Sequence, residues 1–243
     1  MRTHPTPAVQ APLRAHARTR QARRSDTRPH APRRLALSLA VATALAVVAP
    51  VGAATRTWTG ASCGSFAGNC NWASGDGDYN NWNLPQGHDS FSLPINGDSL
   101  AFGGVYGLRA RHDIVALTSV AGISFLEAAG PFVLLGRTLN NAGPISNASN
   151  QLQTISLDLN VGSSQTWDGG TGGLLVTGTV ALGTSALSLV NHARIANATL
   201  PFTLNGTLSL TSGSSLQSAS AALGTVVDKH ALLTVTGAGS SWV

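Results

Sequence analysis

The chain has 243 residues and a formal net charge of +5, which is enough for one large domain or two small ones and suggests a basic protein. The charge is unevenly distributed, because nine of the fifteen basic residues are arginines at or before Arg34. Residues 55–243 carry six basic and nine acidic side chains, a net charge of −3. The folded part therefore lacks the basic surface that nucleic-acid binding needs, and we expect no nucleic-acid partner.

Residues 1–54 have the parts of a secretory signal peptide with an extended basic segment in front. The basic segment is followed by Leu35–Val48, an uncharged run rich in Ala, Leu and Val, and then by the small residues Ala53 and Ala54. This pattern predicts export, with a mature chain that begins at Ala54 or Thr55 and contains no membrane span. A permanent transmembrane helix is the alternative, but the apolar run is short for one.

Two cysteines bracket a short Gly- and Asn-containing loop, CGSFAGNC, between Cys63 and Cys70. In an oxidising compartment two such cysteines most often pair, so we expect a structural disulfide. A metal site is the alternative. It would need further Cys or His ligands nearby, and the closest histidine is His88.

The exported part divides by composition into two regions. Residues 55–113 form a Trp-rich N-terminal region that holds Trp58, Trp72, Trp82 and both cysteines. Residues 114–243 consist mainly of Gly, Ser, Thr, Asn, Leu and Val. The whole chain has a single Glu and a single Lys, residues that exposed helix faces use heavily, so we expect an all-β protein.

The second region alternates between apolar and polar residues, as a half-buried strand does. Leu157 and Leu159, for example, flank Asp158. Because neighbouring side chains of a strand face opposite sides, Asp158 should point to water. The same parity places six side chains in the core: Leu157, Leu159, Val180, Leu182, Leu204 and Leu208.

An internal repeat favours a solenoid. VTGTVAL at Val176–Leu182 resembles LNGTLSL at Leu204–Leu210, 28 residues later, and periods of this size are typical of stacked coils. We therefore predict a parallel β-helix over residues 114–243, with the Trp-rich region as its N-terminal cap. An antiparallel β-sandwich would show the same alternation and is the alternative. No capping element follows the final GAGSSWV, so we expect a fragment of a longer protein.

Several segments in order resemble a known family. RTWTG at Arg56–Gly60, NNW at Asn80–Trp82, PINGDSLAFGG at Pro94–Gly104 and SSQTWDGGTGGLLVTG at Ser163–Gly178 are similar to bacterial autotransporter-type passengers with autotransporter-associated β-strand repeats. The resemblance implies a right-handed parallel β-helix at the outer membrane or released from the cell. It also implies an adhesin-like or structural role, with a host or neighbouring cell surface, or glycans, as partner. The cysteine pair is a departure from the family pattern.

Two binding sites can be considered in the Trp-rich region. The tryptophans could form a platform for sugar rings, but we expect them to cover the open end of the core instead. Asp76, Asp78 and Asn80 alternate as the first ligands of a calcium loop do, yet the later Gly and Glu of that motif are missing. We favour ordinary turn chemistry for this cluster and expect no cofactor, with calcium as the weaker alternative.

Catalysis would need two carboxylates in one cleft. The solenoid offers only scattered acids, of which Asp158 and Asp168 are separated by a turn-rich segment that could bring them together. No nucleophile and base stand out, so we expect a non-catalytic protein. A carbohydrate-binding or polysaccharide-degrading β-helix is the alternative.

Overall fold

The structure of the protein is a computed structural model that describes residues 53–63, 70–73, 75–76, 79–83, 93–224 and 230–243. The predicted signal peptide up to residue 52 lies outside the described residues. Apart from one 3₁₀ turn, η1 (Ala61–Cys63), every element in the described part of the chain is a β-strand. The all-β prediction is therefore confirmed.

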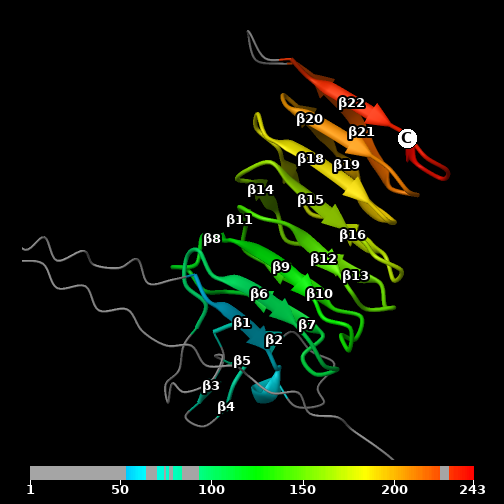
Figure 1. The fold of residues 1–243 in the computed structure, drawn as a ribbon. Helices are drawn as coiled ribbons and strands as arrows, with labels where there is room; N and C mark the ends of the chain where they lie inside the picture. Colours follow the sequence, from blue (N-terminus) through cyan, green and yellow to red (C-terminus); the bar gives the residue numbers. More distant parts are fainter. Residues whose placement is uncertain (1–52, 64–69, 74, 77–78, 84–92, 225–229) are drawn as a thin grey trace, which may run out of the picture. The chain divides into compact units, whose positions relative to one another are not determined.

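Apart from the antiparallel pair β3 (Gly75–Asp76) and β4 (Tyr79–Asn80), the described strands form three stacks, which we call sheets I, II and III and in which every pairing except that of β1 with β5 is parallel (Figure 1). Sheet I contains β1 (Thr55–Trp58), β5 (Trp82–Asn83), β6 (Ser99–Phe102), β9 (Gly122–Phe125), β12 (Ile145–Asn147), β15 (Gln165–Asp168), β18 (Ala186–Val190), β20 (Thr207–Leu210) and β22 (Leu232–Val235). Sheet II contains β2 (Cys70–Asn71), β7 (Arg109–His112), β10 (Val133–Gly136), β13 (Gln153–Ile155), β16 (Leu174–Val176), β19 (Ala193–Leu204), β21 (Ser215–Leu223) and β23 (Ser241–Trp242). Sheet III contains β8 (Ser119–Val120), β11 (Leu139–Asn141), β14 (Leu159–Val161) and β17 (Val180–Ala181).

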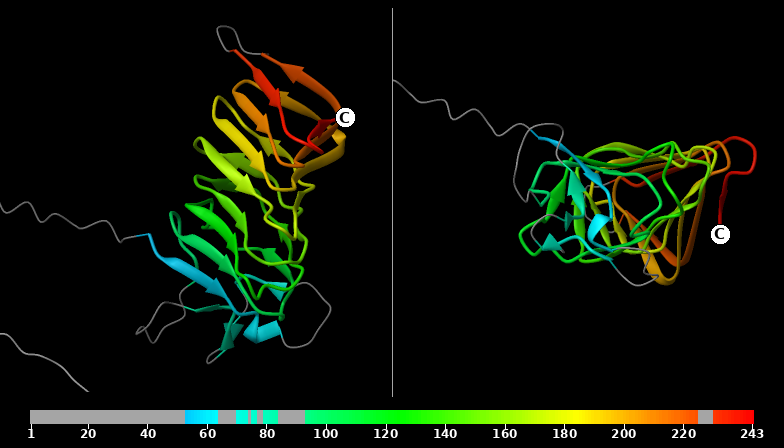
Figure 2. Two further views of the ribbon diagram at one scale, coloured as in Figure 1. Left: turned by 45° about the vertical axis from the view of Figure 1, so that its right-hand side comes forward. Right: turned by 90° about the horizontal axis from the view of Figure 1, so that it is seen from below.

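The chain visits the sheets in turn, so each coil lies on the one before it, as both views in Figure 2 show. From β6 to β22 every neighbouring pair in sheet I is parallel. This topology is a parallel β-helix, and the antiparallel sandwich is wrong. Leu100 pairs with Ile123, 23 residues on, whereas Leu187 pairs with Leu208, 21 residues on. The 28-residue sequence repeat is therefore not the coil spacing.

Apolar rows fill the axis of the solenoid, as the parity of the sequence predicts. The six residues expected in the core are all buried, and Asp158 is exposed. The alternation from Ile155 to Val161 is nevertheless not one strand, because β13 and β14 are joined by a corner at residues 156–158. The backbone keeps its parity around that corner. At the matching corner of the next coil a Cβ at Gly178 would collide with the carbonyl of Leu157, so close stacking there requires glycine.

The last coils have a different cross-section. Sheet III ends at β17, and β19 and β21 are long strands that replace two short strands and a corner. Their pairing shifts between Asn197 and Pro201, which marks a bulge. A bulge bends a strand, so this shift is consistent with one strand following two faces of the coil.

The N-terminal region covers the first coil, as predicted. Trp58, Trp72 and Trp82 are at most 1% exposed, and all three rings pack on Phe102 of β6 with centroid distances of 5.6–6.0 Å. β5 pairs antiparallel with β1 and ends sheet I at this side. β1 pairs parallel with β6, and β6 pairs parallel with β9, so the ladder of sheet I crosses the expected boundary near Asp113 without a break.

Candidate functional site

The sugar-platform alternative for the tryptophans is wrong, because a stacking platform must expose an aromatic face and these rings are buried. Trp58 and Trp82 meet edge to face at 5.0 Å, as do Trp72 and Trp82 at 5.4 Å. The indole N–H of Trp82 donates to the carbonyl of Trp72 at 3.1 Å. The cluster is a hydrophobic plug, in keeping with its place at the end of sheet I.

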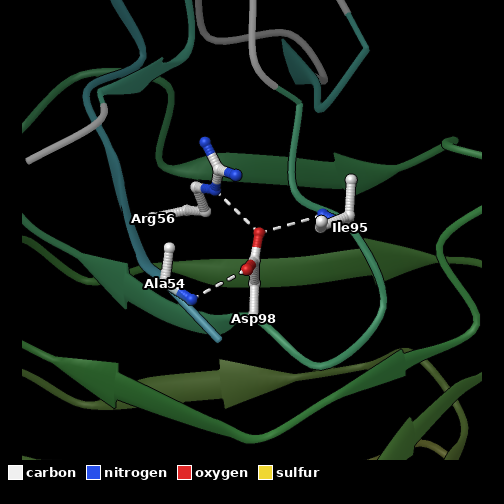
Figure 3. Close-up of polar contacts among 4 residues, drawn as sticks. All are labelled: Ala54, Arg56, Ile95 and Asp98. Carbon is white, nitrogen blue, oxygen red and sulfur yellow. Dashed lines mark hydrogen bonds and ion pairs between the residues drawn. The ribbon is translucent and has the colours of Figure 1, made fainter. Parts of the chain in front are cut away.

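A buried ion pair joins the first strand to the turn before β6. Asp98 is 1% exposed, and its carboxylate accepts the Nε–H of Arg56 at 2.7 Å. It also accepts the backbone N–H groups of Ala54 and Ile95, each at 3.0 Å (Figure 3). Because three donors satisfy this one carboxylate, the cluster holds the start of the fold together and leaves no obvious place for a ligand. Sequence reasoning missed it, since the pair spans 42 residues.

Cys63 and Cys70 form a disulfide, which confirms the predicted pairing, and their Cα atoms are 5.7 Å apart. The bond links η1 to β2. Asn81, fully buried, donates its side-chain amide to the carbonyl of Asn71 at 2.9 Å and approaches Cys70 Sγ at 3.4 Å. The disulfide and this amide fasten the segment that carries Trp72 and Trp82.

The residues considered as calcium ligands are not seen to form a cluster in the described part of the chain. Asp76 lies on β3 (Gly75–Asp76) and Asn80 on β4 (Tyr79–Asn80), two strands that pair antiparallel, whereas Asp78 lies outside the described residues. Within the described ranges, no three His, Cys, Asp or Glu side chains gather as a metal site would require. The hairpin agrees with the turn interpretation, and calcium binding remains an untested hypothesis.

The two candidate catalytic acids occupy different corners of the coil. Asp158 lies between sheets II and III and accepts the backbone N–H of Thr179 at 2.8 Å. Asp168 ends a strand of sheet I and accepts Gly170 N–H at 2.8 Å and the Asn191 amide at 3.0 Å. Each carboxylate thus fastens its own coil to the next one.

Polar side chains form rows on the outside of the stack. In sheet I one row runs through directly paired residues: Thr166, Ser188, Ser209 and Thr234. In sheet III the Asn160 amide donates to the Asn140 side-chain oxygen at 2.7 Å. Rows arise because each coil places the same register position above the last, so a repeated residue type becomes a continuous stripe.

A groove of about 490 Å³ opens where sheet I turns into sheet II. Its lining includes Leu152, Thr171, His192, Arg194, Ser215 and Ser241, and no carboxylate among the described residues lines it. These side chains come from successive coils. Arg194, Ser215 and Ser241 are register partners on the outside of sheet II.

An unusually short corner explains the groove. Between β18 and β19 the corner has two residues, Asn191 and His192, both left-handed with φ of 50° and 64°. The corner before it spans residues 169–173, and the corner after it spans residues 211–214. The chain is therefore set back at the short corner between two longer ones, which leaves a hollow over His192.

The polar groups of the groove are oriented by neighbouring coils. Arg194 Nε–H donates to the Ser215 hydroxyl at 3.2 Å. His192 Nδ1 lies 3.2 Å from the carbonyl of Gly170, which can only accept, so Nδ1 donates this hydrogen bond and Nε2 is the ring nitrogen left for the groove. In the sequence Arg194 has no charged neighbour that would mark it as part of a site. The short corner could have been found only once the strand ends were known.

Within the described part of the chain, no helix is long and apolar enough to cross a membrane. Comparison of this chain with family models, with curated proteins and with solved structures finds no match.

Proposed function

We propose that this chain is an exported, non-catalytic β-helical scaffold with an adhesin-like or structural role at a bacterial surface or outside the cell. The observation that carries the proposal is the outer surface of the coils, where Ser, Thr and Asn form rows and the acids serve as links between coils. A surface of hydroxyl and amide groups offers many hydrogen bonds to a polar partner but no paired acid and base.

Three further features support this proposal. The resemblance to autotransporter-type passengers implies a surface role. The Cys63–Cys70 disulfide fits an oxidising compartment outside the cytoplasm. The leader has the pattern of a signal peptide, so the protein would reach such a compartment through the secretory route.

A carbohydrate-active β-helix is the second candidate, and the groove over His192 favours it. A polysaccharide-degrading enzyme requires groups that move protons or stabilise charge at the scissile bond. Arg194 and His192 could contribute to such a site, but the groove has no carboxylate among its described lining residues. Binding without cleavage is therefore the better reading of the groove.

The full chain, expressed in a secreting bacterium, provides the test. We expect the processed protein in the extracellular or surface fraction, attachment of the purified product to cells or immobilised glycans, and no release of new reducing ends from polysaccharides. Asp168→Asn serves as a matched control, because it removes a candidate acid outside the groove lining. Release of reducing ends that Asp168→Asn abolishes would contradict the proposal and favour an enzyme.

A further inference from the structure

The groove presents one fixed cation to solvent. Arg194 is exposed at the start of β19, and within the described part of the chain its side chain makes one hydrogen bond, from Nε. Among the described residues, the ion pair of the fold joins Arg56 to Asp98, and no acid is paired with Arg194. The two terminal nitrogens of the guanidinium are therefore free to form parallel hydrogen bonds to one planar anion.

Acceptors and hydroxyl groups surround this cation. His192 Nε2 offers one more hydrogen-bonding group, and the hydroxyls of Thr171, Ser215 and Ser241 can both donate and accept. The exposed side chain of Leu152 adds an apolar surface at one side of the groove. A ligand that satisfies all these groups carries an anion, several hydroxyls and an apolar face.

The floor of the groove is kept low by glycine. Gly213 has a φ of 77°, and a Cβ there would lie 3.0 Å from Cδ2 of the His192 ring. A side chain at this position would both strain the backbone and displace the imidazole. The lining residues come from five consecutive coils, so the hollow follows from the way the coils stack.

We propose that this groove binds a carboxylated saccharide, with the carboxylate on the Arg194 guanidinium and the sugar hydroxyls on His192 and the neighbouring Ser and Thr side chains. This inference rests on the proposed adhesive function and names the class of its partner. The groove volume of about 490 Å³ suits a ligand with several sugar rings better than a single inorganic anion.

Binding of an oligogalacturonate, a chain of uronic acids, to the full processed protein tests the proposal by calorimetry. Its carboxyl-reduced neutral counterpart and inorganic phosphate are the comparison ligands. We expect Arg194→Gln to weaken oligogalacturonate binding by roughly tenfold to a hundredfold, because a hydrogen-bonded charge is lost. The affinity of Arg194→Lys should lie between those of the wild type and Arg194→Gln, since lysine keeps the charge but cannot form the two parallel hydrogen bonds of a guanidinium.

Arg111→Gln is the matched control, because Arg111 is also an exposed arginine of sheet II but does not line the groove. It should leave binding unchanged, and thermal melting should show that all variants remain folded. Equal binding by wild type and Arg194→Gln, equal affinity for the neutral saccharide, or equal affinity for phosphate would each overturn the inference.

The two proposals fail in different ways. If the protein attaches to cells but binds oligogalacturonate no better than the neutral saccharide, the groove assignment is wrong and the adhesive role stands. If the groove binds the saccharide as described but the exported protein neither attaches to surfaces nor remains outside the cell, the adhesive role is wrong and the site stands.

Discussion

His112 is a fully buried histidine that packs against the tryptophan plug. Its ring stacks on Trp72 with centroids 4.6 Å apart, and its Nε2–H donates to the carbonyl of Leu117 at 3.0 Å. Its Nδ1 has no hydrogen-bond partner among the described residues. Burial lowers the pKa of His112 below its ordinary value, an effect that Arg137 reinforces and that the Leu117 bond and Asp113 oppose.

The lowered pKa predicts acid sensitivity. Because the unfolded chain takes up a proton at His112 before the folded protein does, the free energy of unfolding should fall as pH drops below the ordinary value of 6.5. His112→Gln keeps a donor for the Leu117 carbonyl and should remove this part of the pH dependence. Urea midpoints at about pH 7.5 and about pH 5.5 check it. The same acid-induced loss in both proteins would show that other groups cause it.

The buried carboxylate of Asp98 makes a prediction about processing. It accepts the N–H of Ala54 at 3.0 Å. Cleavage before Ala54 would turn that donor into an ammonium group and strengthen the bond, whereas cleavage before Thr55 would remove it. Both sites suit a signal peptidase, and we expect the product that begins at Ala54 to be the more stable of the two. N-terminal sequencing of exported protein decides between them, and retention of residues 35–48 would instead indicate a membrane anchor.

At the scale of the strand, parity predicts unequal effects for two substitutions. Leu204 is 1% exposed, so Leu204→Ala should lower the free energy of unfolding by about 2–5 kcal/mol through loss of packing. Asp158 is exposed and accepts one backbone N–H, a role that an amide oxygen can fill. Asp158→Asn should therefore change stability by less than about 0.5 kcal/mol. Denaturation midpoints compare them, and a more damaging Asp158→Asn would place Asp158 in an unrecognised site.

Parity could be predicted from sequence because it depends only on neighbouring residues. Leu157, Asp158 and Leu159 each face the expected side. Corners could not be predicted, because the alternation continues through the turn at residues 156–158 and hides it. The hidden corners also explain why the sequence repeat does not give the coil spacing. VTGTVAL contains β17 of sheet III, whereas LNGTLSL contains β20 of sheet I, so the two segments are not equivalent positions of two coils.

The candidate groove and the Asp98 cluster depend on contacts between distant residues. Arg56 and Asp98 meet only when β1 is laid on β6, and Arg194 meets Ser215 only when β19 is laid on β21. Local sequence carries no signal for either contact. The disulfide was predictable because its cysteines are close in sequence and are the only two in the chain.

At the scale of the whole β-helix, the polar rows and the groove depend on one feature, the register of coil upon coil. That register aligns the hydroxyl rows of sheet I and places the short corner at Asn191–His192 between two longer ones. If neighbouring coils were offset, the rows would break and the groove lining would disperse. Both features therefore require that equivalent positions of successive coils are direct parallel neighbours.

Cysteine cross-linking tests this claim most directly. Ser188 pairs with Ser209 in the next coil, and Thr166 pairs with Ser188 in the coil before it. One strand spacing of about 4.8 Å lies within the reach of a disulfide, whereas two spacings, about 9.6 Å, do not. The double variant Ser188→Cys/Ser209→Cys should form an internal disulfide on mild oxidation, and Thr166→Cys/Ser209→Cys should retain two free thiols. Cross-linking of the second pair but not of the first would contradict the stacked parallel coils.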